Sequence, residues 1–211
     1  MIISHKHRYI FFAVPKTGTH SVRQALRPYL DATDQEQVAL FVDRRLDIPE
    51  LGALGHGHLS VQQVEPVLGA VFHDYFKFAF VRNPYDRFVS YCAFMTRQNG
   101  QFEQDPRGVM RYFIRDRPPL GHLLFRPQYE MLVDAQGRVA MDFVGKSERA
   151  QQDYAQICAR LGFPAETLGK VNSSRHAPYA AYYDDELREL VGNFYRRDLE
   201  LFGYEFSAAA G

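Results

Sequence analysis

The feature that most constrains this 211-residue chain is an apolar run that leads through a short polar loop into a helical pattern. Residues 9–14 read Tyr-Ile-Phe-Phe-Ala-Val, which is too short to span a bilayer and suits a buried strand. Residues 15–21 read Pro-Lys-Thr-Gly-Thr-His-Ser. Apolar side chains then recur at helical spacing over residues 21–30. The start of the chain therefore predicts a strand, a loop and a helix in immediate succession.

Strands and helices continue to alternate along the chain. A second apolar run predicts a strand over residues 76–81, followed by an Asn-Pro helix start and a helix to about residue 97. Helices are also expected over residues 60–68, 147–161 and 184–202, the last two closed by glycines. A loop with a short helix is expected over residues 31–51, a short strand or loop over 54–58, and strands over 132–133 and 139–144.

This alternation predicts an α/β fold with a mainly parallel central sheet flanked by helices. Ligands of such folds bind at the carboxyl ends of the strands. The length fits one P-loop-like domain over residues 1–211.

The loop after the first strand has the chemistry of an anion site. A helix N-terminus presents unpaired N–H groups and a partial positive charge. Gly18 lets the backbone approach an anion closely, and Lys16 adds a full charge. Hydroxyl donors come from Thr17, Thr19 and Ser21. The order of residues differs from that of a Walker A loop. An ordinary strand–helix turn with a solvated lysine is the alternative.

A second motif follows the strand at residues 76–81. Arg82 stands at the end of that strand, where its guanidinium can bind a phosphate through a forked pair of donors. Ser90 lies seven residues after the helix cap Asn83 and so shares its helix face. Taken alone, Arg82 fits a surface or ion-paired arginine better than a phosphate ligand.

Together the two motifs resemble the nucleotide-binding signature of sulfotransferases that use 3′-phosphoadenosine 5′-phosphosulfate (PAPS). Residues 15–21 look like their 5′-phosphosulfate loop, and residues 81–90 look like their 3′-phosphate motif. Residues 142–148 and 182–204 are similar to the carbohydrate sulfotransferase branch. The resemblance covers most of residues 9–206.

The resemblance implies a role for each matching residue. The 5′-phosphosulfate would be held by Lys16, Thr17, Gly18, Thr19 and Ser21, and the 3′-phosphate by Arg82 and Ser90. His20 departs from the family pattern, and either donates to the sulfate or caps the helix. A late basic loop covers the nucleotide in many sulfotransferases, which implies 3′-phosphate or acceptor contacts from Ser174 and Arg175; a plain solvated loop is the alternative. The donor would be PAPS, the product adenosine 3′,5′-bisphosphate (PAP), and no metal would be needed.

His56-Gly-His58 is the candidate for the base that deprotonates the acceptor. Histidine titrates near neutral pH, and in an extended segment these two side chains share a face. The segment resembles a His-Gly-His of uronyl 2-O-sulfotransferases, which implies His56 as the base first and His58 second. A zinc site shared by the two histidines and a purely structural role are the alternatives.

Composition limits the remaining choices. The 25 basic and 25 acidic residues balance, which argues against nonspecific nucleic-acid binding. Cys92 and Cys158 match no metal spacing and read as buried thiols of a reducing compartment. No transmembrane segment or signal anchor is expected, so we expect a cytoplasmic, bacterial protein.

The expected function is sulfuryl transfer to a small-molecule or oligosaccharide hydroxyl, with a sugar favoured by the resemblance. A nucleotide kinase with an atypical phosphate loop and a noncatalytic nucleotide-binding module are the competing functions. The sequence leaves the acceptor and the oligomeric state open.

Overall fold

The computed structural model describes residues 1–39, 43–169 and 177–207. The chain forms two compact units, one of Met1–Val81 with Gln128–Val171 and one of Arg82–Pro127 with Asn172–Gly211. One domain over the whole chain stays a prediction, because two compact units can belong to one domain.

The first unit is built on a five-stranded sheet in the order β3-β1-β2-β4-β5. The strands are β1 (Ile2–Ser4), β2 (Tyr9–Phe12), β3 (Gln35–Glu36), β4 (Phe76–Val81) and β5 (Phe143–Lys146). β4 runs parallel to both β2 and β5, whereas β1 is antiparallel to both β2 and β3. The α/β prediction is confirmed: β2, β4 and β5 are parallel as predicted, and the antiparallel β1 makes the sheet mixed.

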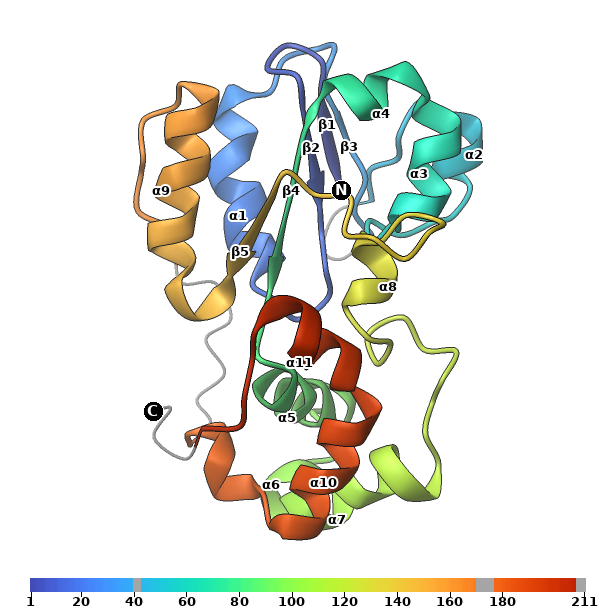
Figure 1. Cartoon of the computed structure of the whole chain (residues 1–211), viewed down its shortest axis with the longest axis vertical. Coiled ribbons are helices and arrows are strands. Elements are labelled where there is room, and N and C mark those ends of the chain that lie inside the picture. Colours follow the sequence, from blue (N-terminus) through green and yellow to red (C-terminus); the bar gives the residue numbers. More distant parts are fainter. Residues whose placement is uncertain (40–42, 170–176, 208–211) are drawn as a thin grey trace. The chain divides into compact units, whose positions relative to one another are not determined.

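Helices cover both faces of this sheet (Figure 1). α1 (Thr19–Leu26) and α9 (Ala150–Leu161) lie on one side. α2 (Pro49–Gly52), α3 (Val61–Leu68) and α4 (Ala70–Asp74) lie on the other. The first unit therefore has three layers, as expected for a sheet whose parallel strands are buried on both faces.

The core beneath α1 and α9 is aromatic and explains why the two predicted strands pair. Phe11 of β2 stacks on Phe78 of β4, with ring centroids 5.2 Å apart. The buried members of this core are Ile2, Tyr9, Phe11, Ala13, Val22, Leu26, Phe78, Phe80, Tyr154, Ile157, Cys158 and Phe163.

Most predicted boundaries in the first unit are close to the observed ones. β4 coincides with the predicted strand, and α3 begins after Ser60, whose capping box with Gln63 fixes the helix start. Gly162 ends α9 in the left-handed conformation, with φ of 73°. β2 ends two residues before the prediction, at Phe12.

Other predictions for the first unit were wrong. The segment predicted as a strand at 132–133 is the end of α8 (Tyr129–Leu132), followed by an isolated bridge between Val133 and Val139. β5 begins only at Phe143, near the end of the strand predicted over 139–144. Residues 54–58, predicted as a short strand or a loop, form the loop.

The second unit is helical. It contains α5 (Pro84–Met95), α6 (Gln101–Gln104), α7 (Pro106–Arg111), α10 (Asp185–Phe194) and α11 (Arg196–Phe202). α10 and α11 replace the single helix predicted over 184–202.

Aromatic side chains fill the core of the second unit. Phe88 and Tyr91 of α5 surround Phe125, with ring centroids 6.2 and 5.4 Å from its own. The hydroxyl of Tyr195 donates to the carbonyl oxygen of Phe125 at 2.7 Å. Tyr195, with φ of −99° and ψ of 21°, lies between α10 and α11, so a core contact coincides with the break in the predicted helix.

Cys92 and Cys158 are both buried, as predicted. Across the described ranges of the chain, no helix combines the length and the apolar character needed to cross a bilayer.

Candidate functional site

The loop between β2 and α1 has the backbone geometry of an anion-binding nest. Lys16 and Gly18 have φ of 67° and 78°, and Thr17 between them is not among the residues with positive φ. An alternation in the sign of φ along successive residues makes their N–H groups converge on one point, which suits an anion. A lysine in the left-handed region is strained by about 1–2 kcal/mol, which is the kind of cost that functional sites carry.

Two hydroxyl groups fix the shape of this loop from within the protein. Thr17, which is 2% exposed, donates its own hydroxyl to the carbonyl oxygen of Val14 at 3.0 Å. Ser147 donates to the carbonyl oxygen of Thr17 at 2.9 Å. The Thr17 hydroxyl therefore shapes the loop, and only the backbone of Thr17 remains for a ligand.

The residues of the first turn of α1 are compatible with a bound anion. The N-cap is Gly18, which has no side chain with which to cap the helix, and no acidic residue lies in the first turn. Thr19 is buried at 9% exposure, whereas Ser21 is partly exposed. The first turn of α1 itself therefore supplies no carboxylate to offset the partial positive charge of the helix end.

His20 is the second residue of α1 and is partly buried. Burial, reinforced by the charges of Arg23 and Arg27, lowers the pKa of His20. Its imidazole is therefore neutral at pH 7. Both predicted roles, donor to the sulfate and helix cap, stay predictions.

His58 is held in one tautomer beside the loop. Its Nδ1 lies 2.6 Å from the carbonyl oxygen of Ala13, three residues before Lys16. A carbonyl can only accept, so Nδ1 carries the proton and Nε2 of the neutral ring is an acceptor. Burial lowers the pKa of His58 to about 3, and the charge of Arg23 acts in the same direction.

His56 lies in a different environment two residues earlier. Its Nδ1 is buried and has no hydrogen-bond partner within the described part of the chain, and burial lowers its pKa. The backbone between the histidines is tightly packed, since a Cβ on Gly57 would lie 2.0 Å from the carbonyl oxygen of Gln37. The structure thus fixes the position of both histidines but gives only His58 a defined tautomer.

Zinc bound by His56 and His58 would need further ligands, and the described residues show none. Within the described residues, no group of three His, Cys, Asp or Glu side chains is arranged to hold a metal ion.

The second predicted motif begins the second unit. Arg82 donates from Nε to Asp86 at 2.7 Å, one turn further along the chain. The side chain of Asn83 caps α5 by accepting from the backbone N–H of Tyr85 at 3.0 Å, as predicted. Ser90 lies on α5 and is 6% exposed. Ser174 and Arg175 lie outside the described residues.

Sequence reasoning missed two residues close to the phosphate loop. Ser147 was assigned only to a helix start, yet it bonds the loop at Thr17. Arg23 lies on α1 and is 4% exposed; its Nε has no hydrogen-bond partner among the described residues. A basic residue four positions after Thr19, on the same helix face, was the only signal for Arg23 in the sequence.

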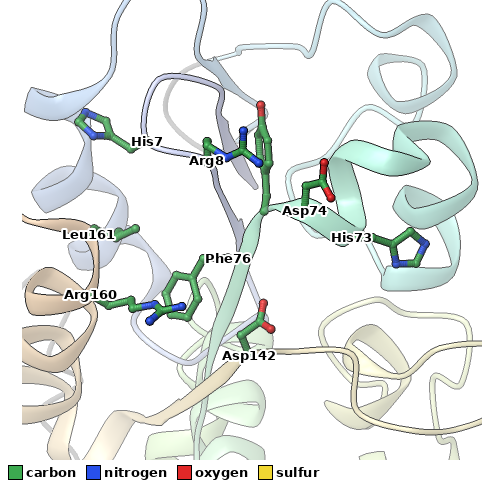
Figure 2. A pocket seen from close by; sticks show the side chains of 9 residues that line it. His7, Arg8, His73, Asp74, Phe76, Asp142, Arg160 and Leu161 are labelled. Carbon is green, nitrogen blue, oxygen red and sulfur yellow. The ribbon is translucent and has the colours of Figure 1, made fainter.

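A cavity in the first unit lies elsewhere (Figure 2). It has a volume of about 410 Å³ and lies beside the amino ends of β2, β4 and β5. Its lining residues are His7, Arg8, His73, Asp74, Tyr75, Phe76, Asp142, Arg160 and Leu161. Its charges are mixed, and ligands of open α/β sheets bind at the opposite ends of the strands. We therefore place the candidate site at the β2–α1 loop.

Comparison with known proteins identifies the class. The profile of the sulfotransferase family matches residues 1–205, so the chain belongs to the sulfotransferase family. This confirms the resemblance drawn from the two motifs.

Individual relatives are more distant. The chain is 23% identical to carbohydrate sulfotransferase 14 of Danio rerio, over 97% of this chain and 62% of that protein. It is 23% identical to carbohydrate sulfotransferase 14 of Homo sapiens, over 74% of this chain and 45% of that protein. An uncharacterized protein of Archaeoglobus fulgidus is 28% identical over 52% of this chain and 86% of its own length. The chain thus spans less than two thirds of the carbohydrate sulfotransferases that it matches. No solved structure gives a significant match.

Proposed function

We propose that the chain is an enzyme that transfers a sulfuryl group from PAPS to a hydroxyl of a carbohydrate and releases PAP. Family membership and the carbohydrate sulfotransferases among its relatives support the reaction class. The observation that carries the proposal is the alternation of φ from Lys16 to Gly18 at the end of β2, beside a histidine of fixed tautomer. The P-loop-like character of the fold is part of the proposal.

The donor would be held through both of its phosphate ends. The N–H groups of the loop and the Lys16 ammonium would bind the 5′-phosphosulfate, with the first turn of α1 adding its dipole. Arg82 and Ser90 would bind the 3′-phosphate, with Asp86 orienting the guanidinium through Nε. Ser174 and Arg175 are proposed on the resemblance alone.

We assign the base to His58 rather than to His56, which reverses the order implied by the resemblance. The bond from Nδ1 to Ala13 supports this choice, because it leaves Nε2 as the acceptor for a substrate proton. A pKa of about 3 makes His58 a weak base in the unliganded chain. Binding of the anionic donor nearby would raise this pKa toward neutrality, since a negative charge favours the imidazolium.

The reaction requires one bond to form and one to break. The acceptor oxygen attacks sulfur while Nε2 of His58 takes its proton. The bond between sulfur and the bridging oxygen breaks, and its electron pair stays on the 5′-phosphate of PAP. Lys16 and the loop N–H groups stabilise the charge that develops there, so the proposed mechanism uses no metal.

The proposal is tested by incubating the protein with sulfur-labelled PAPS and a panel of acceptors. The panel should hold desulfated glycosaminoglycans, simple sugars, a phenol and a tyrosine peptide. We expect label on a carbohydrate, and its loss in Lys16→Ala. Label only on the phenol or the peptide would overturn the carbohydrate assignment. No transfer to any acceptor, or phosphoryl transfer from ATP instead, would overturn the reaction.

A further inference from the structure

Ser147 connects the ends of two neighbouring strands. It follows β5 directly and opens a 3₁₀ turn, Ser147–Arg149. Its Oγ lies 2.9 Å from the carbonyl oxygen of Thr17 in the phosphate loop and 3.0 Å from that of Val81, the last residue of β4. Val81 in turn precedes Arg82 in the chain. The Ser147 hydroxyl therefore contacts the backbone of the phosphate loop at Thr17 and the backbone of the residue before Arg82.

The backbone that carries Ser147 is itself held on both sides. Gly145 pairs with Phe80 of β4, and a Cβ on Gly145 would lie 2.6 Å from the Phe80 ring, so the two strands approach closely at this point. The N–H of Lys146 donates at 2.6 Å to the carboxylate of Asp153, which is fully buried. The backbone that carries the Ser147 hydroxyl is thus fixed by strand packing and by a buried hydrogen bond.

Because a peptide group is planar, the hydrogen bond from Ser147 also fixes the orientation of the Thr17–Gly18 peptide. In a planar trans peptide the C=O and the following N–H point in opposite directions. The carbonyl of Thr17 and the N–H of Gly18 belong to one such peptide. When Ser147 holds the carbonyl on the side of β5, the N–H of Gly18 is directed to the opposite side. Without this bond the peptide next to a glycine can rotate, and a carbonyl oxygen facing an anion repels it.

We propose that Ser147 is a positioning residue that locks the Thr17–Gly18 peptide with its N–H toward the 5′-phosphosulfate. This inference rests on the proposed function, since it assigns the anion of the loop to the 5′ end of PAPS. Ser147 touches no reacting atom; it acts through Gly18. The ligand class concerned is therefore a nucleotide with a 5′-phosphate, and the 3′-phosphate should not depend on Ser147.

A matched pair of variants isolates the hydroxyl. Ser147→Thr keeps it, whereas Ser147→Val has the same shape as threonine without it, and thermal unfolding shows whether each variant folds. Calorimetric titration with PAP should give a Kd about tenfold higher in Ser147→Val and nearly unchanged in Ser147→Thr. Adenosine 3′-monophosphate, which lacks the 5′-phosphate, should bind both variants and the unchanged protein alike, within about twofold.

A second measurement follows the peptide itself. The amide resonance of Gly18 should shift on addition of PAP in the unchanged protein and in Ser147→Thr, but much less in Ser147→Val. Equal PAP affinity and equal shifts in the two variants would overturn the inference while leaving the proposed function standing. An equal loss for both nucleotides would also overturn it, because the effect would then be general. If the unchanged protein binds no PAP, the proposed function fails first and the inference falls with it.

Discussion

The two ends of the parallel strands β2, β4 and β5 both carry basic residues, but they use them differently. At the amino ends, Arg8 lies over the ring of Tyr75 at 5.5 Å. Arg160 lies over the ring of Phe76 at 5.7 Å, and both of these side chains are labelled in Figure 2. These cations rest on aromatic faces in a cavity that also holds carboxylates. Arg8 also has a positive φ, of 53°, but among the described residues no position within two of it does, so the alternation seen from Lys16 to Gly18 is absent there.

At the carboxyl end of β2 the charge of Lys16 comes with a specialised backbone. Lys16 and Gly18 adopt positive φ, Ser147 holds the intervening carbonyl, and His58 is fixed against Ala13. This difference indicates that basic side chains alone do not identify the ligand-binding site of an α/β sheet. The candidate site is distinguished by the pair of positive φ values at Lys16 and Gly18 and by hydrogen bonds that orient their loop.

The largest expected effect separates the two histidines. His58→Ala should lower kcat about 10²–10³-fold, because it removes the proposed base. His56→Ala should have a much smaller effect, since the Nδ1 of His56 has no hydrogen-bond partner among the described residues and no tautomer fixed by one. Steady-state sulfuryl transfer measures both, with PAP affinity as the control for folding. A larger loss in His56→Ala would return the base to His56.

The second-largest expected effect is a difference in PAP binding between variants at the two ends of the sheet. Lys16→Ala should weaken PAP binding at least about tenfold, because it removes a charge from the anion site. Arg160→Ala is the matched control at the amino end and should change the Kd by less than about twofold. Isothermal titration calorimetry of both variants with PAP measures the two Kd values. If Arg160→Ala weakened PAP binding more, the site would lie at the cavity.

Backbone strain in the loop gives a smaller effect. Gly18→Ala meets no atom within 4 Å, so its cost comes from φ of 78° alone, about 1–2 kcal/mol of unfolding free energy. Gly121→Ala also meets no atom but lacks a positive φ, and should cost less than about 0.5 kcal/mol. Urea unfolding compares them. Equal costs would mean that the left-handed conformation of Gly18 is not a constraint.

The smallest effect concerns pH. The folded-state pKa of His58 is about 3, against an ordinary value of 6.5. Below pH 6.5 the unfolded chain binds a proton that the folded chain does not, so stability falls as the pH decreases toward 3. Between pH 7.5 and 5.5 the loss from His58 should be about 1 kcal/mol, and His58→Gln should remove it. An identical pH dependence in the variant would show that His58 is not held neutral.

Much of the fold was predictable because its signals are local. The strand at 76–81, the Asn83 cap and the glycines that end α9 and α11 are each written in a few adjacent residues. β1 and β3 were missed because three- and two-residue strands carry no period. The break at Tyr195 was missed because it coincides with a tertiary contact to Phe125.

The candidate site was predictable only in part, because several of its features depend on burial and on contacts between residues distant in sequence. The motif gave Lys16 and Gly18, but the inward turn of the Thr17 hydroxyl depends on its burial. Ser147 lies 130 residues from its partner Thr17, so no local pattern could relate them. The preference for His58 over His56 comes from one bond to a carbonyl 45 residues away.

The most direct test of the central claim is a calorimetric titration of the protein with PAP beside ATP and adenosine 5′-monophosphate. We expect tight binding of PAP, weaker binding of the two nucleotides that lack a 3′-phosphate, and a lower PAP affinity in both Lys16→Ala and Arg82→Ala. Equal affinity for all three nucleotides, or no binding of PAP, would contradict the account of both phosphate motifs and the proposed reaction with them.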